Sequence, residues 1–106
     1  MAWVLLFVAG VFETIWAWTM KMSDGFTRPV MSVATALAMF ASIGLLSVSM
    51  RTLPLGTAYP VWTGIGAVGT FLVGVVVLGE SVSLTRVVAA VLIVSGLLLM
   101  KASAGS

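Results

Sequence analysis

The chain has 106 residues, of which 61% are hydrophobic and only 8% are charged, with a formal net charge of +2. Soluble domains carry about 25% charged residues, so this composition and a mean hydropathy of +1.26 indicate a membrane protein. The absence of cysteine and histidine excludes disulfides and thiolate or imidazole metal ligands, and the scattered basic residues argue against a nucleic-acid surface.

Apolar runs long enough to cross a bilayer recur along the chain, since a spanning helix needs about 20 residues. Their length and lack of alternation favour helices over strands. The first run has no basic residue before Glu13, so we expect a helix of the mature protein and not a signal peptide. The sequence predicts an all-α membrane protein with one domain, 1–106, a polar tail, 101–106, and transmembrane helices at 2–20, 29–50, 55–78 and 84–100.

The loops between these runs are short, which predicts antiparallel neighbours and a compact four-helix unit. The basic residues do not fix its orientation. If the N-terminus is cytoplasmic, that side holds its amine, Arg51 and Lys101, and the other side holds Lys21, Arg28 and Arg86. This balance favours insertion in both orientations, although one dominant basic residue would also explain it. A homodimer of oppositely inserted chains would supply the inverted half that transporters need.

Glu13 is a charged residue deep inside an apolar run. At 1.5 Å per residue it lies about 17 Å along the first helix, just past the middle of a core about 30 Å thick. A charged Asp, Lys or Arg at that depth costs about 2.5–3.5 kcal/mol. One interpretation is a protonated carboxyl group that hydrogen-bonds between helices. The other, usual for an intramembrane carboxylate, is a proton or cation site that faces a cavity.

Trp16 lies three residues after Glu13 and therefore shares its helix face, together with Gly10. Its indole N–H can donate to a carboxylate, and its ring can face a cation. The competing interpretation is an ordinary packing tryptophan. Gly10 leaves room for a close backbone or for a ligand.

One face of the third helix carries a phenol hydroxyl, an indole, a threonine hydroxyl and a glycine at positions i, i+3, i+4 and i+7, where the glycine has no side chain. Such an aromatic stripe more often packs than binds, but its polar groups favour a wet cavity. Ser42 and Ser49 form a weaker polar line on the second helix, although serines inside helices usually bond their own backbone. The stripe consists of Tyr59, Trp62, Thr63 and Gly66.

Glycines cluster on the third helix at Gly64 and Gly66. They permit close packing in membranes and also mark a possible bend, so a packing surface and a hinge are both open interpretations. On the fourth helix, Ala89 and Gly96 belong to a small-residue face without cavity-type polar groups. This face predicts a dimer contact.

Short motifs occur in a fixed order along nearly the whole chain: Phe12-Glu13, Trp16-Ala17, Met20-Lys21, residues 25–28, 52–54, 56–59, 62–67 and 79–81, and Gly96. Together they resemble the small multidrug resistance family of four-helix transporters, and in particular its guanidinium-exporter branch. Trp16 marks that branch, because the quaternary-ammonium branch has a small residue there. Pro60 is a departure, since members often carry alanine at this position.

The resemblance implies an antiparallel, dual-topology homodimer in the bacterial inner membrane that exchanges protons for a cation. It implies that Glu13 of both subunits forms the shared proton and substrate site. By the same motif match, Trp16, Ser42 and Trp62 hydrogen-bond or orient the carboxylates, and Tyr59 lines the pocket and couples the two halves.

We therefore expect a proton-coupled antiporter that exports guanidinium and small guanidinyl cations. Its partners are the cation, protons, the bilayer and a second copy of the chain, with no cofactor, metal or nucleic acid. The planar guanidinium fork matches carboxylate oxygens two at a time. Two alternatives are an exporter of bulky quaternary cations, against which Trp16 argues, and a non-transporting membrane assembly subunit. No nucleophile–base pair or phosphate-binding loop predicts an enzyme.

Overall fold

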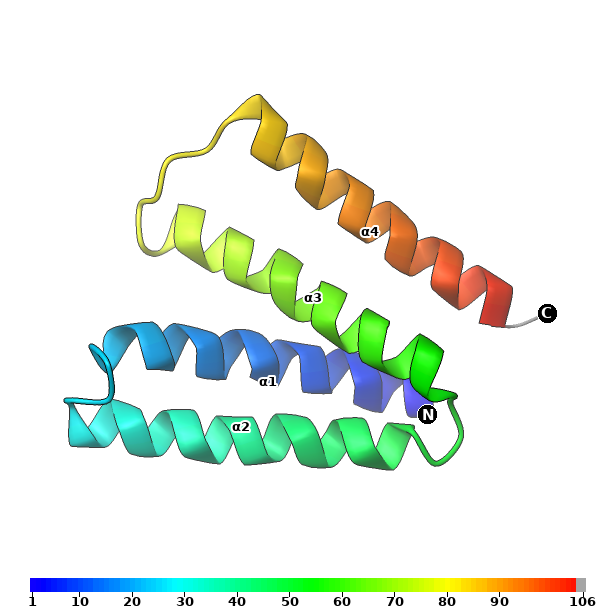
Figure 1. Cartoon of the computed structure of the whole chain (residues 1–106), viewed down its shortest axis with the longest axis horizontal. Coiled ribbons are helices and arrows are strands. Elements are labelled where there is room, and N and C mark those ends of the chain that lie inside the picture. Colours follow the sequence, from blue (N-terminus) through cyan, green and yellow to red (C-terminus); the bar gives the residue numbers. More distant parts are fainter. Residues whose placement is uncertain (105–106) are drawn as a thin grey trace.

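The computed structural model describes residues 1–104, and these form four α-helices (Figure 1). Each helix is long and apolar enough to cross a membrane. The prediction of an all-α protein with four transmembrane helices is confirmed. The helices are α1 (Ala2–Met22), α2 (Pro29–Ser49), α3 (Leu55–Val76) and α4 (Leu84–Ala104).

Proline and serine set the helix boundaries. Pro29 is the first residue of α2 and follows an extended Arg28, where the missing N–H of proline costs nothing. In the turn before it, the buried Ser23 hydroxyl donates to the carbonyl oxygen of Met20 over 2.6 Å and accepts the N–H of Phe26 over 3.1 Å. These bonds hold a tight reversal between α1 and α2, in which Gly25 has a φ of 71°.

The helix ends differ from the expected ones by a few residues. Helix α1 extends to Met22, and α3 ends at Val76. The larger difference is at the C-terminus, where α4 continues through Ala104 across most of the predicted polar tail. Lysine and alanine favour helix, so nothing in residues 101–104 stops it. Residues 105–106 of that tail lie outside the described part of the chain.

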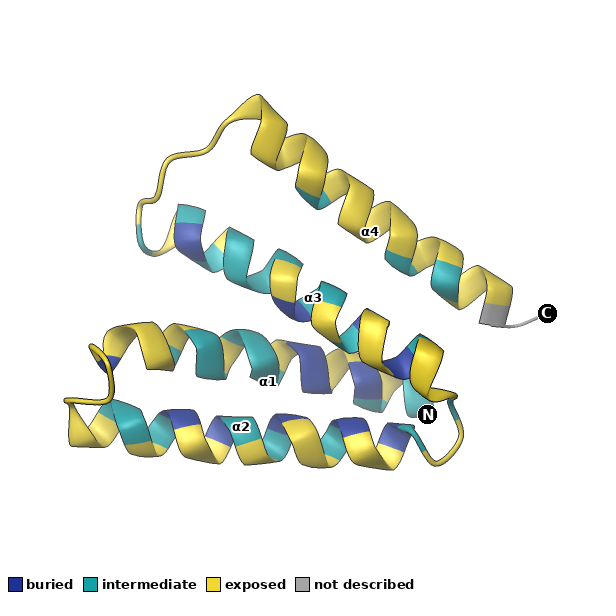
Figure 2. Ribbon diagram, in the orientation of Figure 1, coloured by how far each residue is buried: buried dark blue, intermediate teal, exposed yellow. Residues whose placement is uncertain are grey.

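The helices form a flat arrangement of 46 × 34 × 17 Å in the spatial order α2, α1, α3, α4 (Figure 1). Helix α1 packs against α2 and α3, and α4 packs against α3 and leans away from the others (Figure 1). None of the spanning window of α4 is buried, against 17–22% for the other three (Figure 2). The expectation that all four helices pack into one compact unit is therefore wrong, because within the described residues α4 contacts only α3. The connection of residues 77–83 leaves α4 free to diverge.

The hydrophobic core lies where α1, α2 and α3 meet, around Leu6, Ala9, Leu46, Ala58 and Val61. Many large apolar side chains outside it are exposed. In a bilayer the lipid tails are the solvent for such residues, because spanning helices satisfy their backbone internally and present apolar side chains outward. The small core thus fixes three helices and leaves most of α4 to another partner or to lipid.

Candidate cation and proton site

Glu13 lies on α1 with its carboxyl group against Gly66 of α3. A Cβ atom built on Gly66 would be 2.5 Å from the carboxyl carbon of Glu13, so no side chain larger than hydrogen fits there without moving it. Gly66 is buried, and α3 is a continuous helix on both sides of it. Gly66 therefore provides the surface against which Glu13 rests, and its predicted role as a hinge stays a prediction.

Two further glycines bring α1 and α3 close together around Glu13. The side chain of Ile65 fills the space beside Gly10, and the hydroxyl of Thr14 fills the space beside Gly69. Thr14 also donates to the carbonyl oxygen of Gly10 over 3.2 Å. Glycine contacts of this kind let two membrane helices approach closely. The glycines thus fix Glu13 in height and rotation relative to α3.

Ser42 connects α1, α2 and α3 behind Glu13. Its fully buried hydroxyl donates to the carbonyl oxygen of Ala9 over 2.7 Å and accepts the indole N–H of Trp62 over 2.9 Å. The carbonyl of Ala9 is also the helical acceptor for the backbone N–H of Glu13. Within one chain, Ser42 thus bonds both Trp62 and the turn that carries Glu13, while the bonds of Ser42 and Trp62 to the carboxylates stay a prediction.

Two polar atoms next to this network have no hydrogen-bond partner within the described residues 1–104. They are Oε2 of Glu13 and Nε1 of Trp16, and both are buried. Leaving a buried donor or acceptor unpaired costs about 1–3 kcal/mol. One is an acceptor and the other a donor, and they lie one helical turn apart. This pair can bind a ligand or a second chain that supplies the missing partners.

Tyr59 and Trp62 lie side by side on α3, with ring centroids 5.4 Å apart and an angle of 58° between the planes. Tyr59 is 50% exposed, so its hydroxyl is free to reach beyond the chain. Thr63 is exposed as well. The predicted aromatic face is thus split, since Trp62 turns inward to Ser42 and the two hydroxyl residues face outward.

Pro60 lies inside α3 without ending the helix. Its missing N–H leaves the carbonyl of Gly56 without its usual acceptor role, and a ring at this position ordinarily crowds that turn. Pro60 is the sixth residue of α3, near the start of the helix, and Tyr59 keeps its place beside Trp62.

The other predicted glycine and alanine positions separate into two groups. Gly64 packs against α4, where a Cβ would be 2.6 Å from a methyl carbon of Leu97. Ala89 and Gly96 are exposed, and nothing lies within 4 Å of a Cβ built on Gly96. The role of Ala89 and Gly96 as a dimer contact stays a prediction, as does a hinge at Gly64.

A hydrogen bond between Thr19 and Thr35 was missed from the sequence. Their hydroxyl oxygens are 2.7 Å apart, and Thr35 is fully buried between α1 and α2. Together with Ser42 and Ala9 it ties these helices at two levels, on either side of Trp16. Two threonines in apolar runs are visible in the sequence, but each hydroxyl is also within reach of a carbonyl oxygen of its own helix, so their pairing has no sequence signal. The threonine that donates its hydrogen to the other gives up the bond to its own helix.

Comparison with known proteins agrees with this architecture. A family model described as Small Multidrug Resistance protein matches residues 1–93. A guanidinium exporter of Yersinia pseudotuberculosis serotype I (strain IP32953) is 52% identical over 101 residues, which cover 95% of this chain and 97% of that protein. Guanidinium exporters of Citrobacter freundii and Proteus vulgaris are 50% and 48% identical over 103 and 101 residues, covering 97% and 95% of this chain and 98% and 97% of those proteins.

The family match covers far more than half of the chain, and the relatives align along almost their whole length. With four membrane-spanning helices, the protein is a multi-pass integral protein of the bacterial inner membrane. The chain belongs to the small multidrug resistance family.

Proposed function

We propose that this protein exports guanidinium and small guanidinyl cations in exchange for protons. The relatives named guanidinium exporters, about half identical over nearly the full length, support the substrate. In the proposed cycle, protons and the cation compete for two Glu13 carboxylates, contributed by two chains of an antiparallel homodimer. The experiment described below also tests the two alternatives, an exporter of bulky cations and a non-transporting assembly subunit.

The observation that carries the proposal is the buried, unpartnered pair of Glu13 Oε2 and Trp16 Nε1. A purely structural carboxyl group would find its hydrogen-bond partner within the fold, as Ser42 and Thr35 do. Glu13 instead has its carboxyl group held against Gly66, with one oxygen unpaired. An intramembrane carboxylate in this state is suited to accept N–H groups from a cation or to hold a proton.

Competition at one site is sufficient for exchange. A guanidinium ion presents N–H donors in a plane, which match carboxylate oxygens two at a time. Binding it stabilises the ionised carboxylates and expels their protons, and its release lets protons return. If only the loaded dimer changes the side to which the site opens, an inward proton gradient drives the cation outward.

A second copy of the chain supplies what one chain lacks. The unpartnered indole N–H of Trp16 is suited to donate to the Glu13 of a second copy, and the exposed α4 offers an apolar surface for that copy. The balanced basic residues permit opposite insertion of the two chains. Their antiparallel pairing would create the inverted repeat typical of transporters.

Proteoliposomes loaded with guanidinium and placed in a pH gradient test the proposal. We expect guanidinium efflux together with proton uptake in the wild type and none in Glu13→Gln, which still forms a folded dimer. Asp24→Asn, a charge change at an exposed turn outside the site, serves as the control and should transport normally.

Other results would favour the alternatives. Efflux of tetraphenylphosphonium without guanidinium efflux would identify an exporter of bulky cations. Normal behaviour of Glu13→Gln in a larger membrane assembly, with no transport by the wild type, would identify an assembly subunit. Trp16→Ala adds a specificity test, since losing the ring should weaken guanidinium transport about tenfold and admit larger cations.

A further inference from the structure

A second carboxylate, that of Glu80, lies against a glycine of α3 much as Glu13 does. A Cβ atom built on Gly74 would collide with a carboxylate oxygen of Glu80, and the backbone N–H of Glu80 donates to the carbonyl oxygen of Gly74 over 2.9 Å. Gly66 and Gly74 are eight residues apart, or about 12 Å along the helix. Helix α3 therefore positions two carboxylates, one deep and one at its C-terminal end.

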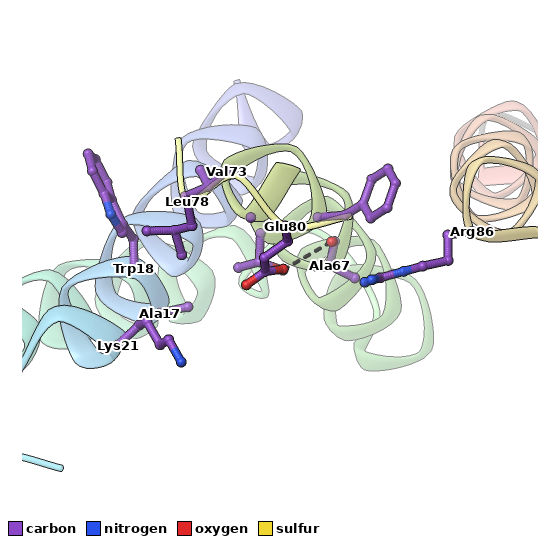
Figure 3. A pocket seen from close by; sticks show the side chains of 11 residues that line it. Ala17, Trp18, Lys21, Ala67, Val73, Leu78, Glu80 and Arg86 are labelled. Carbon is purple, nitrogen blue, oxygen red and sulfur yellow. Dashed lines mark hydrogen bonds between the residues drawn. The ribbon is translucent and has the colours of Figure 1, made fainter. Parts of the chain in front are cut away.

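A cavity of about 360 Å³ lies between α1 and α3, and the carboxylate of Glu80 lines it (Figure 3). Its inner end includes Ala17, one turn beyond Glu13, and Ala67, the neighbour of Gly66. Its outer end includes Glu80, in the exposed connection between α3 and α4. The cavity thus reaches Ala17, within one helical turn of Glu13, while Glu13 itself does not line it.

The side chain of Arg86 lines this cavity and holds its guanidinium group near the ring of Phe71. Its central carbon lies 5.4 Å from the centroid of the Phe71 ring, and both residues line the cavity together with Glu80. Figure 3 shows Arg86 entering from α4 and Glu80 entering from the connection, on opposite sides. Aromatic faces attract guanidinium groups, so the cavity accommodates the chemical group that the protein is proposed to export.

We propose that Glu80 and Phe71 form an outer binding site for guanidinium, at which the free cation competes with the side chain of Arg86. The carboxylate of Glu80 would accept two N–H groups of the planar cation, and the ring of Phe71 would cover its face. This outer site rests on the proposed function, because it serves as a first binding step on the route to Glu13.

The positive side chains nearby keep this site weak. Lys21 and Arg86 line the same cavity, and Lys21 and Glu80 also line an adjoining one with Asp24 and Arg28. Weak binding suits an outer site on a conduction route, since a cation must enter readily and leave readily. The outer site therefore raises the rate of loading at low substrate concentration and contributes little to affinity at Glu13.

The test compares guanidinium transport and binding in the wild type, Glu80→Gln, Arg86→Gln and Phe71→Leu. At guanidinium concentrations below saturation, Glu80→Gln and Phe71→Leu should slow transport about threefold to fivefold, the range of an exposed charge pair, with the maximal rate unchanged. Arg86→Gln should raise the subsaturating rate. Added salt should slow the wild type and leave Glu80→Gln unaffected, because screening weakens exposed charges.

Equilibrium binding isolates the outer site from Glu13. By calorimetry, Glu13→Gln should retain weak guanidinium binding that the double variant Glu13→Gln, Glu80→Gln loses. Glu80→Asp keeps the charge and should restore the subsaturating transport rate, which a merely structural role for Glu80 would not require. Arg51→Gln, a charge change at the exposed turn between α2 and α3 and outside both cavities, is the control and should match the wild type.

Two results overturn the outer site alone: wild-type transport with no change in Glu80→Gln, or the same loss in Arg86→Gln as in Glu80→Gln. The second result would mean that the two residues act as a structural pair. Failure of the wild type to bind and transport guanidinium would overturn the proposed function and the outer site together, so the two failures are distinguishable.

Discussion

The indole N–H of Trp62 donates to the hydroxyl of Ser42 across 2.9 Å, which joins α3 to α2 at the level of the Glu13 turn. Ser42 in turn donates its single hydrogen to the carbonyl of Ala9 on α1. One hydroxyl group thus holds three helices in fixed relation. Movement of α3 relative to α1 must break or exchange one of these two bonds, so Ser42 lies on any path of conformational change through this site.

Ser42→Ala should lower the free energy of unfolding by about 1–3 kcal/mol, because it leaves the indole N–H of Trp62 without its acceptor. Ser49→Ala is the matched control. Ser49 is equally buried on the same helix, but it bonds the carbonyl of Leu46 in its own helix. Denaturant unfolding in detergent micelles measures both variants, and equal losses would contradict the bridging role of Ser42.

Gly66→Ala should weaken guanidinium binding at Glu13 and leave the weak binding of the outer site, because the added methyl group takes the space of the Glu13 carboxyl carbon and forces the carboxyl group to move. Gly44→Ala is the control, since nothing lies within 4 Å of a Cβ at that position on α2. Calorimetric titration with guanidinium distinguishes them, with wild-type affinity expected for Gly44→Ala. Normal binding by Gly66→Ala would show that Glu13 does not need this position.

Thr19→Val should destabilise the α1–α2 pair by about 0.5–1.5 kcal/mol through loss of the Thr19–Thr35 hydrogen bond. A double-mutant cycle with Thr35→Val measures the coupling, and the double variant should lose less than the sum of the single variants. Ser32→Ala, whose exposed hydroxyl bonds its own helix, is a control for which we expect little change. Additive losses would argue against a direct bond.

Guanidinium affinity should fall as pH falls, because a proton on Glu13 removes the charge that the cation needs. If each bound cation releases one proton, the apparent affinity changes by up to about tenfold per pH unit. The Glu80→Gln variant should keep this dependence, whereas Glu13→Gln should lose it. Affinity that is independent of pH in the wild type would exclude competition between protons and the cation.

Much of the fold follows from run length in the sequence. Four apolar runs predict four spanning helices, and Glu13 is conspicuous because a carboxylate is costly at that depth. The divergence of α4 does not follow, because a short connection permits several packing angles. The extension of α4 through Ala104 was also missed, since small residues after Lys101 resemble a tail while still favouring helix.

The contacts of the candidate site were less predictable. Periodicity placed Trp62 and Gly66 on related faces of α3, but it gave no rotation of α3 relative to α1 and α2. For that reason the bond of Ser42 to Ala9 and the position of Gly66 against Glu13 were both unforeseen. A glycine in the sequence shows that no side chain occupies a position, but only the structure shows which neighbouring group lies in that space.

The contact between Glu13 and Gly66 also limits how substrate range can change. Even alanine in this position would force the carboxyl group of Glu13 to move. We therefore expect variants that accept new cations to alter other residues, such as Trp16 or the exposed Tyr59 and Thr63, while Gly66 stays the same. We expect selection experiments for new substrates to yield substitutions at residues near the Glu13 carboxylate, such as Trp16, and none at Gly66.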